Sequence, residues 1–117
     1  MDGNNYHEPA NALSQKTRSY VRALNSLKEE IEAVDWYIQR VGVEEDDELK
    51  AIMTHNMEEE MEHAAMTLEW LRRNMHGWDQ YLREFLFTSD NIAHHEEEGG
   101  ESEKSSSSSD LGIGNLK

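Results

Sequence analysis

Two residues near the middle of the chain, Glu60 and His63, have the types and the spacing of a metal-ligand pair. Residues three apart in a helix project from one face, so a carboxylate oxygen and an imidazole nitrogen can reach the same ion. At about 100° per residue, Glu60 falls on the midline of an apolar stripe. The other residues of this stripe are Leu49, Met53, Asn56, His63, Ala64, Thr67 and Leu71. A carboxylate that loses its water there is costly unless a cation or a proton neutralises it, so the pattern predicts one of these two partners for Glu60.

The preceding segment supplies another carboxylate, Glu30, at the edge of its own apolar seam, with Tyr37 two turns further along. Carboxylate di-iron bundles use a Glu from each of two helices and a Glu-x-x-His from each of the other two. One chain holds half of that set, so a symmetric dimer would complete it. The four carboxylates would then balance the charge of two divalent ions. Oxygen and imidazole ligands suit iron, manganese or zinc, and the sequence does not choose among them.

Plainer interpretations of the same residues compete with the metal site. A single Glu-x-x-His pair arises often by chance in an acidic helical protein. Glu29 and Glu32 are typical of a solvated helix face, and Trp36 and Tyr37 are typical of packing. The position of Glu60 within an apolar stripe, with Glu30 on the preceding segment, favours the metal interpretation.

Two long helices are predicted to position these side chains. A heptad-like seam with alternating spacings of four and three runs through Tyr20, Leu24, Leu27, Ile31, Val34, Ile38 and Val41. Pro9 marks a possible start of this first helix, and Gly42 offers a left-handed stop. The acidic run 44–48 suits the start of a second helix, which is expected to run to about Asn74 with Gly77 closing it.

A shorter helical pattern follows in Trp78, Tyr81, Leu82, Phe85 and Leu86, and no useful strand alternation is found. The predicted fold class is therefore all-α, an antiparallel two-helix hairpin plus a short C-terminal helix. Such a hairpin is half of a four-helix bundle, which a dimer would complete. The predicted organisation is an N-terminal arm over residues 1–8, a helical domain over 9–87, a flexible polar linker over 88–110 and a terminal peptide over 111–117.

Composition limits the function further. The chain has 117 residues, and its 11 Lys and Arg against 25 Asp and Glu give a formal charge of −14. This charge argues against nucleic acid and anionic membrane surfaces and in favour of cations as partners. There is no cysteine, so disulfides and thiolate metal sites are excluded. The N-terminus has no signal-peptide pattern and no apolar run approaches membrane-spanning length, so a cytosolic location is expected.

The segments EEIEAVDWYIQRV (29–41) and HNMEEEMEHAAMTLEWLRR (55–73), together with HEP at 7–9, resemble the encapsulated ferritins. The resemblance implies a two-helix protomer that dimerises into a ferritin-like bundle around a di-iron ferroxidase centre, with dimers forming a ring-shaped decamer. It makes Glu30, Glu60 and His63 the iron ligands, with Tyr37 beside them. It also makes Glu29 and Glu32 a site where metal enters and places Trp36 near the iron route.

The C-terminal sequence DLGIGNLK is similar to the peptide with which cargo proteins bind the inner wall of encapsulin shells. Leu111, Ile113 and Leu116 can fill apolar pockets, while Gly112 and Gly114 allow the backbone to approach a surface closely. The competing interpretation is a tail without a binding role. The resemblance implies a cytoplasmic protein that is held inside an encapsulin compartment.

The function that these features predict together is oxidation of Fe²⁺ to Fe³⁺ with O₂, on behalf of a shell that stores the mineral. So small a fold cannot enclose a mineral itself, so storage would require the encapsulin. One alternative is a carboxylate-bridged di-metal oxidase that acts on peroxide or an organic substrate. Another is an acidic helical adaptor that holds a structural divalent ion without catalysis.

Overall fold

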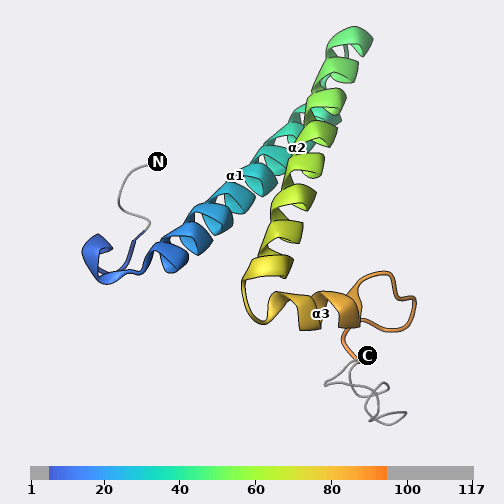
Figure 1. Cartoon of the computed structure of the whole chain (residues 1–117). Helices are drawn as coiled ribbons and strands as arrows, with labels where there is room; N and C mark the ends of the chain where they lie inside the picture. Colours follow the sequence, from blue (N-terminus) through green and yellow to red (C-terminus); the bar gives the residue numbers. More distant parts are fainter. Residues whose placement is uncertain (1–5, 95–117) are drawn as a thin grey trace. The chain divides into compact units, whose positions relative to one another are not determined.

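A computed structural model describes residues 6–94 of the protein. Over this range the chain forms a 3-10 turn, η2 (Ala10–Ala12), and the helices α1 (Gln15–Val43), α2 (Asp47–Asn74) and α3 (Trp78–Phe85), without a strand (Figure 1). The predicted all-α fold of two long helices and one short helix is confirmed. None of the helices in residues 6–94 combines the length and the apolar character needed to cross a membrane.

Helix α1 begins six residues after the proline that marked its possible start. Pro9 precedes η2, and the Nε of Arg18 donates a hydrogen bond of 3.1 Å to the Ala10 carbonyl in that turn. The cap of α1 is Ser14, whose hydroxyl accepts a 3.0 Å hydrogen bond from the Thr17 backbone N–H. A serine that satisfies one of the free amides of the first turn is a strong start signal, which explains why α1 begins here.

The connection between α1 and α2 does not use Gly42. This glycine lies within α1, which continues to Val43 and ends where Glu44 adopts an extended conformation, with φ −73° and ψ 132°. The predicted glycine stop is therefore wrong. The carboxylate of Asp46 accepts a 2.9 Å hydrogen bond from the Leu49 amide and thereby caps α2. Asp47 and Glu48 occupy the first turn of α2, as expected where the helix dipole favours negative charge.

The two long helices form an antiparallel hairpin as far as Leu71 (Figure 1). Near the start of α1, the Tyr20 ring meets the Trp70 ring edge to face at a centroid distance of 6.4 Å. The core of this unit is small. Among residues 6–94, the buried side chains are Met57, Leu71 and the polar Asn25. So small a core stabilises a lone hairpin poorly, and association is a common remedy.

The predicted heptad seam on α1 is only partly covered in the single chain. Leu24, Leu27 and Val34 are half-buried, as the seam predicts. Ile31 and Ile38, however, remain 56% and 51% exposed. The seam is wider than one partner helix can cover, which leaves apolar surface available to another chain.

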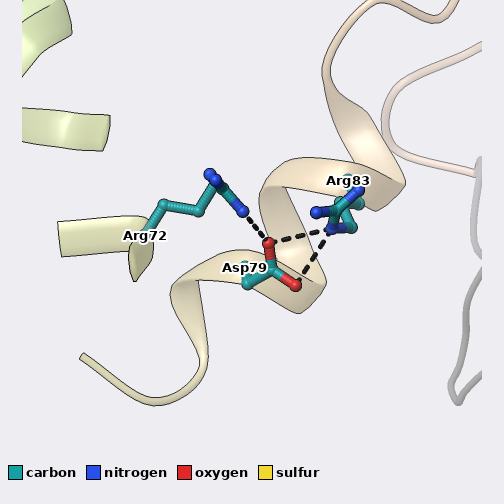
Figure 2. A network of polar contacts seen from close by, with 3 residues as sticks. All are labelled: Arg72, Asp79 and Arg83. Atoms are coloured by element: carbon teal, nitrogen blue, oxygen red, sulfur yellow. Dashed lines mark hydrogen bonds and ion pairs between the residues drawn. The ribbon is translucent and has the colours of Figure 1, made fainter. Parts of the chain in front are cut away.

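A separate compact unit begins at Arg72, in the last turn of α2. Gly77 precedes α3 with φ 105°, a conformation that favours glycine, and α2 ends at Asn74 as predicted. Figure 2 shows Asp79 between two arginines. It accepts a hydrogen bond from Arg72, and both of its oxygens accept from Arg83 Nε, at 2.9 and 3.0 Å. The Arg72 contact ties the first turn of α3 to the last turn of α2, and the Arg83 contacts lie within α3.

Acid should loosen α3 because it removes the charge of Asp79. Desolvation raises the pKa of Asp79, but the hydrogen bonds and charges of Arg72 and Arg83 outweigh it and hold the pKa below its ordinary value. A lowered folded-state pKa gives stabilisation that is fully present above the unfolded pKa, about 3.9, and is lost as the pH falls through the folded value. The effect should be at most about 1 kcal/mol, because the Asp79 side chain is 46% exposed.

Hydrogen exchange of the α3 amides, corrected for intrinsic rates, checks this expectation between pH 5 and pH 3. Wild-type protection should fall by up to about fivefold. The variant Asp79→Asn should start with the lower protection and lose less on acidification. An equal loss of α3 protection in both proteins would show that other carboxylates cause the effect.

Candidate metal centre

Glu60 and His63 lie one turn apart on α2, and their side chains approach each other. Glu60 Oε1 is 3.6 Å from His63 Nδ1. Two protein ligands of one transition-metal ion, each about 2.1 Å from it, lie at most about 4.2 Å apart. The observed separation therefore suits two ligands of one ion without any change in the backbone. In the absence of an ion, the same geometry suits an ion pair with a protonated histidine.

The single chain does not bury this pair. The side chains of Glu60 and His63 are 30% and 52% exposed. The sequence places Glu60 on the midline of the apolar stripe, but in the structure Met57 and Leu71 are the buried residues of α2 and Glu60 is only half-buried. One partner helix covers one side of the stripe. The carboxylate would lose its remaining water only if a further chain covered the other side.

Glu30, on α1, takes part in a contact between the two helices. Its Oε1 accepts a hydrogen bond of 3.3 Å from the hydroxyl of Thr67, and both groups are partly buried. Thr67 lies one turn beyond His63 on α2. Within residues 6–94, no three or more His, Asp and Glu side chains are gathered so that they could hold a metal ion. The described chain thus offers one close ligand pair and one separate carboxylate on the facing helix.

The other predicted site residues lie along α1. Tyr37 is half-buried, and the guanidinium of Arg40 stacks over its ring at 5.3 Å from the centroid. Glu29, Glu32 and Trp36 are exposed. The exposed acids have the accessibility that a route for cations requires, and their role remains a prediction. The predicted docking residues Leu111, Gly112, Ile113 and Leu116 lie outside the described residues.

A further pair of the same residue types occurs one turn earlier on α2. His55 Nε2 is 3.1 Å from Glu59 Oε2, and both side chains are largely exposed. They are four residues apart, and a carboxylate and an imidazole at that spacing stabilise a helix as a surface pair. This pair provides a matched comparison for Glu60 and His63, because it has the same chemistry away from the contact with α1.

Sequence reasoning did not identify a shallow groove between the hairpin helices, with a volume of about 430 Å³. Its lining residues are Ser19, Arg22, Ala23, Ser26, Met66, Thr67 and Trp70. Small residues at positions 19, 23 and 26 of α1 leave room for it, and this spacing of small side chains is visible in the sequence. Because Thr67 lines the groove and also contacts Glu30, the groove adjoins the candidate centre.

Basic and acidic residues occupy different segments of the hairpin. The segment 9–28 contains four basic residues and no acidic residue, whereas the segment 29–69 contains fourteen acidic residues and only Arg40 and Lys50 as basic ones. In the antiparallel hairpin, the acidic segment includes the connection and all the predicted ligands. Its field favours accumulation of cations around the candidate centre.

Comparison with known proteins relates this arrangement to a family. A sequence model of the family described as EncFtn-like matches residues 5–89. A "Ferritin-like protein" of Thermotoga maritima is 58% identical over 111 residues, which cover 95% of this chain and 96% of the relative. An "Encapsulated ferritin-like protein" of Rhodospirillum rubrum is 53% identical over 93 residues, which cover 80% of this chain and 66% of the relative.

A comparison of folds supports the same family relationship. The crystal structure of a protein from Nitrosomonas europaea superimposes with a TM-score of 0.74 at 55% sequence identity, and the match covers 80% of this chain and 100% of that one. The family match includes Glu30, Glu60, His63 and the whole described hairpin. The chain therefore belongs to the EncFtn-like family of encapsulated ferritin-like proteins.

Proposed function

We propose that this protein is a ferroxidase, which oxidises Fe²⁺ to Fe³⁺ with O₂ at a centre formed between two protomers. Membership of a ferritin-like family supports an iron-related role. The observation that carries the finer proposal is the Glu60 and His63 pair, whose 3.6 Å separation suits one ion, with the Glu30 carboxylate on the facing helix. These donors are half of the set that carboxylate di-iron bundles use.

Association of two protomers would supply the second half of the ligand set, which the single chain lacks. A two-fold axis beside Glu60 and His63 would bring together two copies of each ligand and exclude the water that now reaches them. The exposed apolar surface supports such an association, because Ile31, Ile38, Met61 and Met66 are all open to solvent in one chain. Four carboxylates at one centre would repel one another without metal, so binding of two Fe²⁺ ions should favour the dimer by mass action.

Fe²⁺ is the substrate in this proposal. Each ion loses one electron, O₂ accepts the electrons, and Fe³⁺ leaves the site to hydrolyse and mineralise elsewhere. The protein residues bind and orient the ions and compensate their charge. Glu29 and Glu32 are proposed to attract Fe²⁺ to the surface, Trp36 to lie along its route, and Tyr37 to line the centre.

Storage of the product is proposed to take place inside an encapsulin compartment in the cytoplasm. The Rhodospirillum relative is named as encapsulated, which supports this extension. The domain division follows from it: residues 9–87 would form the oxidising unit, residues 88–110 a linker, and residues 111–117 the peptide that docks to the shell. We further propose that the dimers assemble into the ring-shaped decamer that the family resemblance implies.

Iron oxidation should depend on the dimer fraction, because one hairpin supplies two carboxylates and one imidazole. The test begins with metal-free protein diluted through the monomer–dimer transition, which is followed by light scattering. Fe²⁺ is then added in air, and oxygen consumption and ferric absorbance are recorded. The rate per chain should fall in parallel with the dimer fraction. A monomer that oxidises iron at the full rate per chain would contradict the proposal.

A further inference from the structure

We propose that Thr67 is a positioning residue for the candidate centre, because it fixes the carboxylate of Glu30. This inference rests on the proposed function and adds a residue that does not itself bind metal. Its basis is the hydrogen bond of 3.3 Å from the Thr67 hydroxyl on α2 to Glu30 Oε1 on α1. The contact joins residues 37 positions apart in the chain and is partly buried.

The direction of this hydrogen bond distinguishes Thr67 from another threonine of the same helix. Thr54 donates its hydroxyl proton to the carbonyl of Lys50, at 2.8 Å, which is the usual local contact of a threonine within a helix. A threonine hydroxyl has one proton to donate. Thr67 donates that proton to the facing helix instead. Its hydroxyl is therefore used to orient a carboxylate.

The contact has a consequence for metal binding. The Thr67 hydroxyl donates to Oε1 of Glu30, and the lone pairs of Oε2 stay available for a metal ion. Thr67 stands one turn from His63 and two turns from Glu60 on α2, so one hydrogen bond links the helix that carries these two ligands to the helix that carries the third. Hydrogen-bonded partners of metal ligands typically change metal affinity or activity by about 10–100-fold when they are removed.

The contact also reduces the conformational freedom of Glu30. A half-exposed glutamate samples several side-chain rotamers, and ordering it on metal binding carries an entropic cost. A carboxylate that is already hydrogen-bonded has lost part of this freedom before the ion arrives. Thr67 would thus act before the metal binds, which predicts a larger effect on metal affinity than on the rate at saturating iron.

The test compares Thr67→Val, which keeps the β-branched shape and removes the hydroxyl, with Thr67→Ser, which keeps the hydroxyl. Co²⁺, which does not undergo the reaction, is titrated into the metal-free full-length protein, and its absorption spectrum reports affinity and coordination. Thr67→Val should bind Co²⁺ about 10–100-fold more weakly and with an altered spectrum. Thr67→Ser should retain affinity within about threefold. In iron oxidation, Thr67→Val should raise KM more than it lowers kcat.

Two further variants serve as controls for the Co²⁺ titration. Thr54→Val removes the other threonine hydroxyl of α2 and should leave the Co²⁺ spectrum unchanged, and Thr67→Ala repeats the test if valine disturbs the hairpin. Wild-type affinity in both Thr67→Val and Thr67→Ala, or an equal loss in Thr67→Ser, would overturn the role of Thr67. If wild-type protein fails to bind Co²⁺ or oxidise Fe²⁺, the proposed function fails, whereas wild-type behaviour with an unaffected Thr67→Val removes only this inference.

Discussion

Replacing Glu60 or His63 with alanine should abolish rapid iron oxidation while leaving the helices formed. Each substitution removes two ligands from a symmetric centre, one from each protomer. The rate of iron oxidation should fall by more than about 100-fold, because removal of the groups that merely support metal ligands already lowers metal affinity or activity by about 10–100-fold. The helices should persist, since both side chains are partly exposed and neither is part of the buried core. Fe²⁺-dependent oxygen consumption and circular dichroism measure the two effects.

The matched controls are His55→Ala and Glu59→Ala. These remove the same residue types from the neighbouring pair on α2, which is largely exposed. Both controls should retain oxidation within about twofold, because surface pairs contribute at most about 1 kcal/mol to the helix and nothing to the centre. If the Glu60 and His63 variants kept the wild-type rate and metal stoichiometry, the ligand assignment would be wrong.

Removing residues 110–117 should leave iron oxidation almost unchanged and abolish loading into an encapsulin shell. The segment 96–110 contains no apolar residue, so its composition predicts a linker that adds nothing to the core of the oxidising unit and separates the deleted peptide from it. Co-expression with a shell protein, followed by measurement of co-purified cargo and of iron per particle, tests the second part. Cargo loading should fall to the level of an unrelated acidic protein.

Single substitutions identify the docking side chains within residues 110–117. Leu111→Asp, Ile113→Asp or Leu116→Asp should each have much of the effect of the deletion, because each would bury an unpaired charge in an apolar pocket. Lys117→Ala should load normally and serves as the matched control. Equal loading with and without the last eight residues would remove the encapsulin from the proposal without affecting the ferroxidase centre.

The helices could be predicted from the sequence because their patterns are long and periodic. The helical periodicity of α1, the acidic start of α2 and the end of α2 at Asn74 all agree with the structure. Local end signals were less reliable. Pro9 resembles the start of α1, but Ser14 supplies the cap, since hydrogen bonds to free backbone amides decide where a helix begins. Gly42 resembles the end of α1, but the helix continues through it to Val43.

Burial was harder to predict than secondary structure. A heptad pattern shows which face of α1 is apolar, but not whether α2 or another chain covers it. In the single chain α2 leaves Ile31 and Ile38 of this face exposed. The pattern likewise places Glu60 on the midline of the apolar stripe of α2, but its side chain is 30% exposed in the single chain. The approach of His63 to Glu60 could be predicted, because it depends only on helix geometry. The contact of Thr67 with Glu30 could not, because it depends on how two helices pack.

Native mass spectrometry of the metal-free protein, loaded anaerobically with Fe²⁺, is the most direct measurement of a centre shared between protomers. Without oxygen the bound ions stay at the site, so their number can be read for each oligomeric species. Dimers, and larger rings of dimers, should carry two firmly bound ions per pair of chains, and monomers should carry none at the same free concentration. Both Glu60→Ala and His63→Ala should remove these ions from the dimer. Monomers that bind Fe²⁺ as tightly as dimers do, or dimers that bind none, would contradict the account.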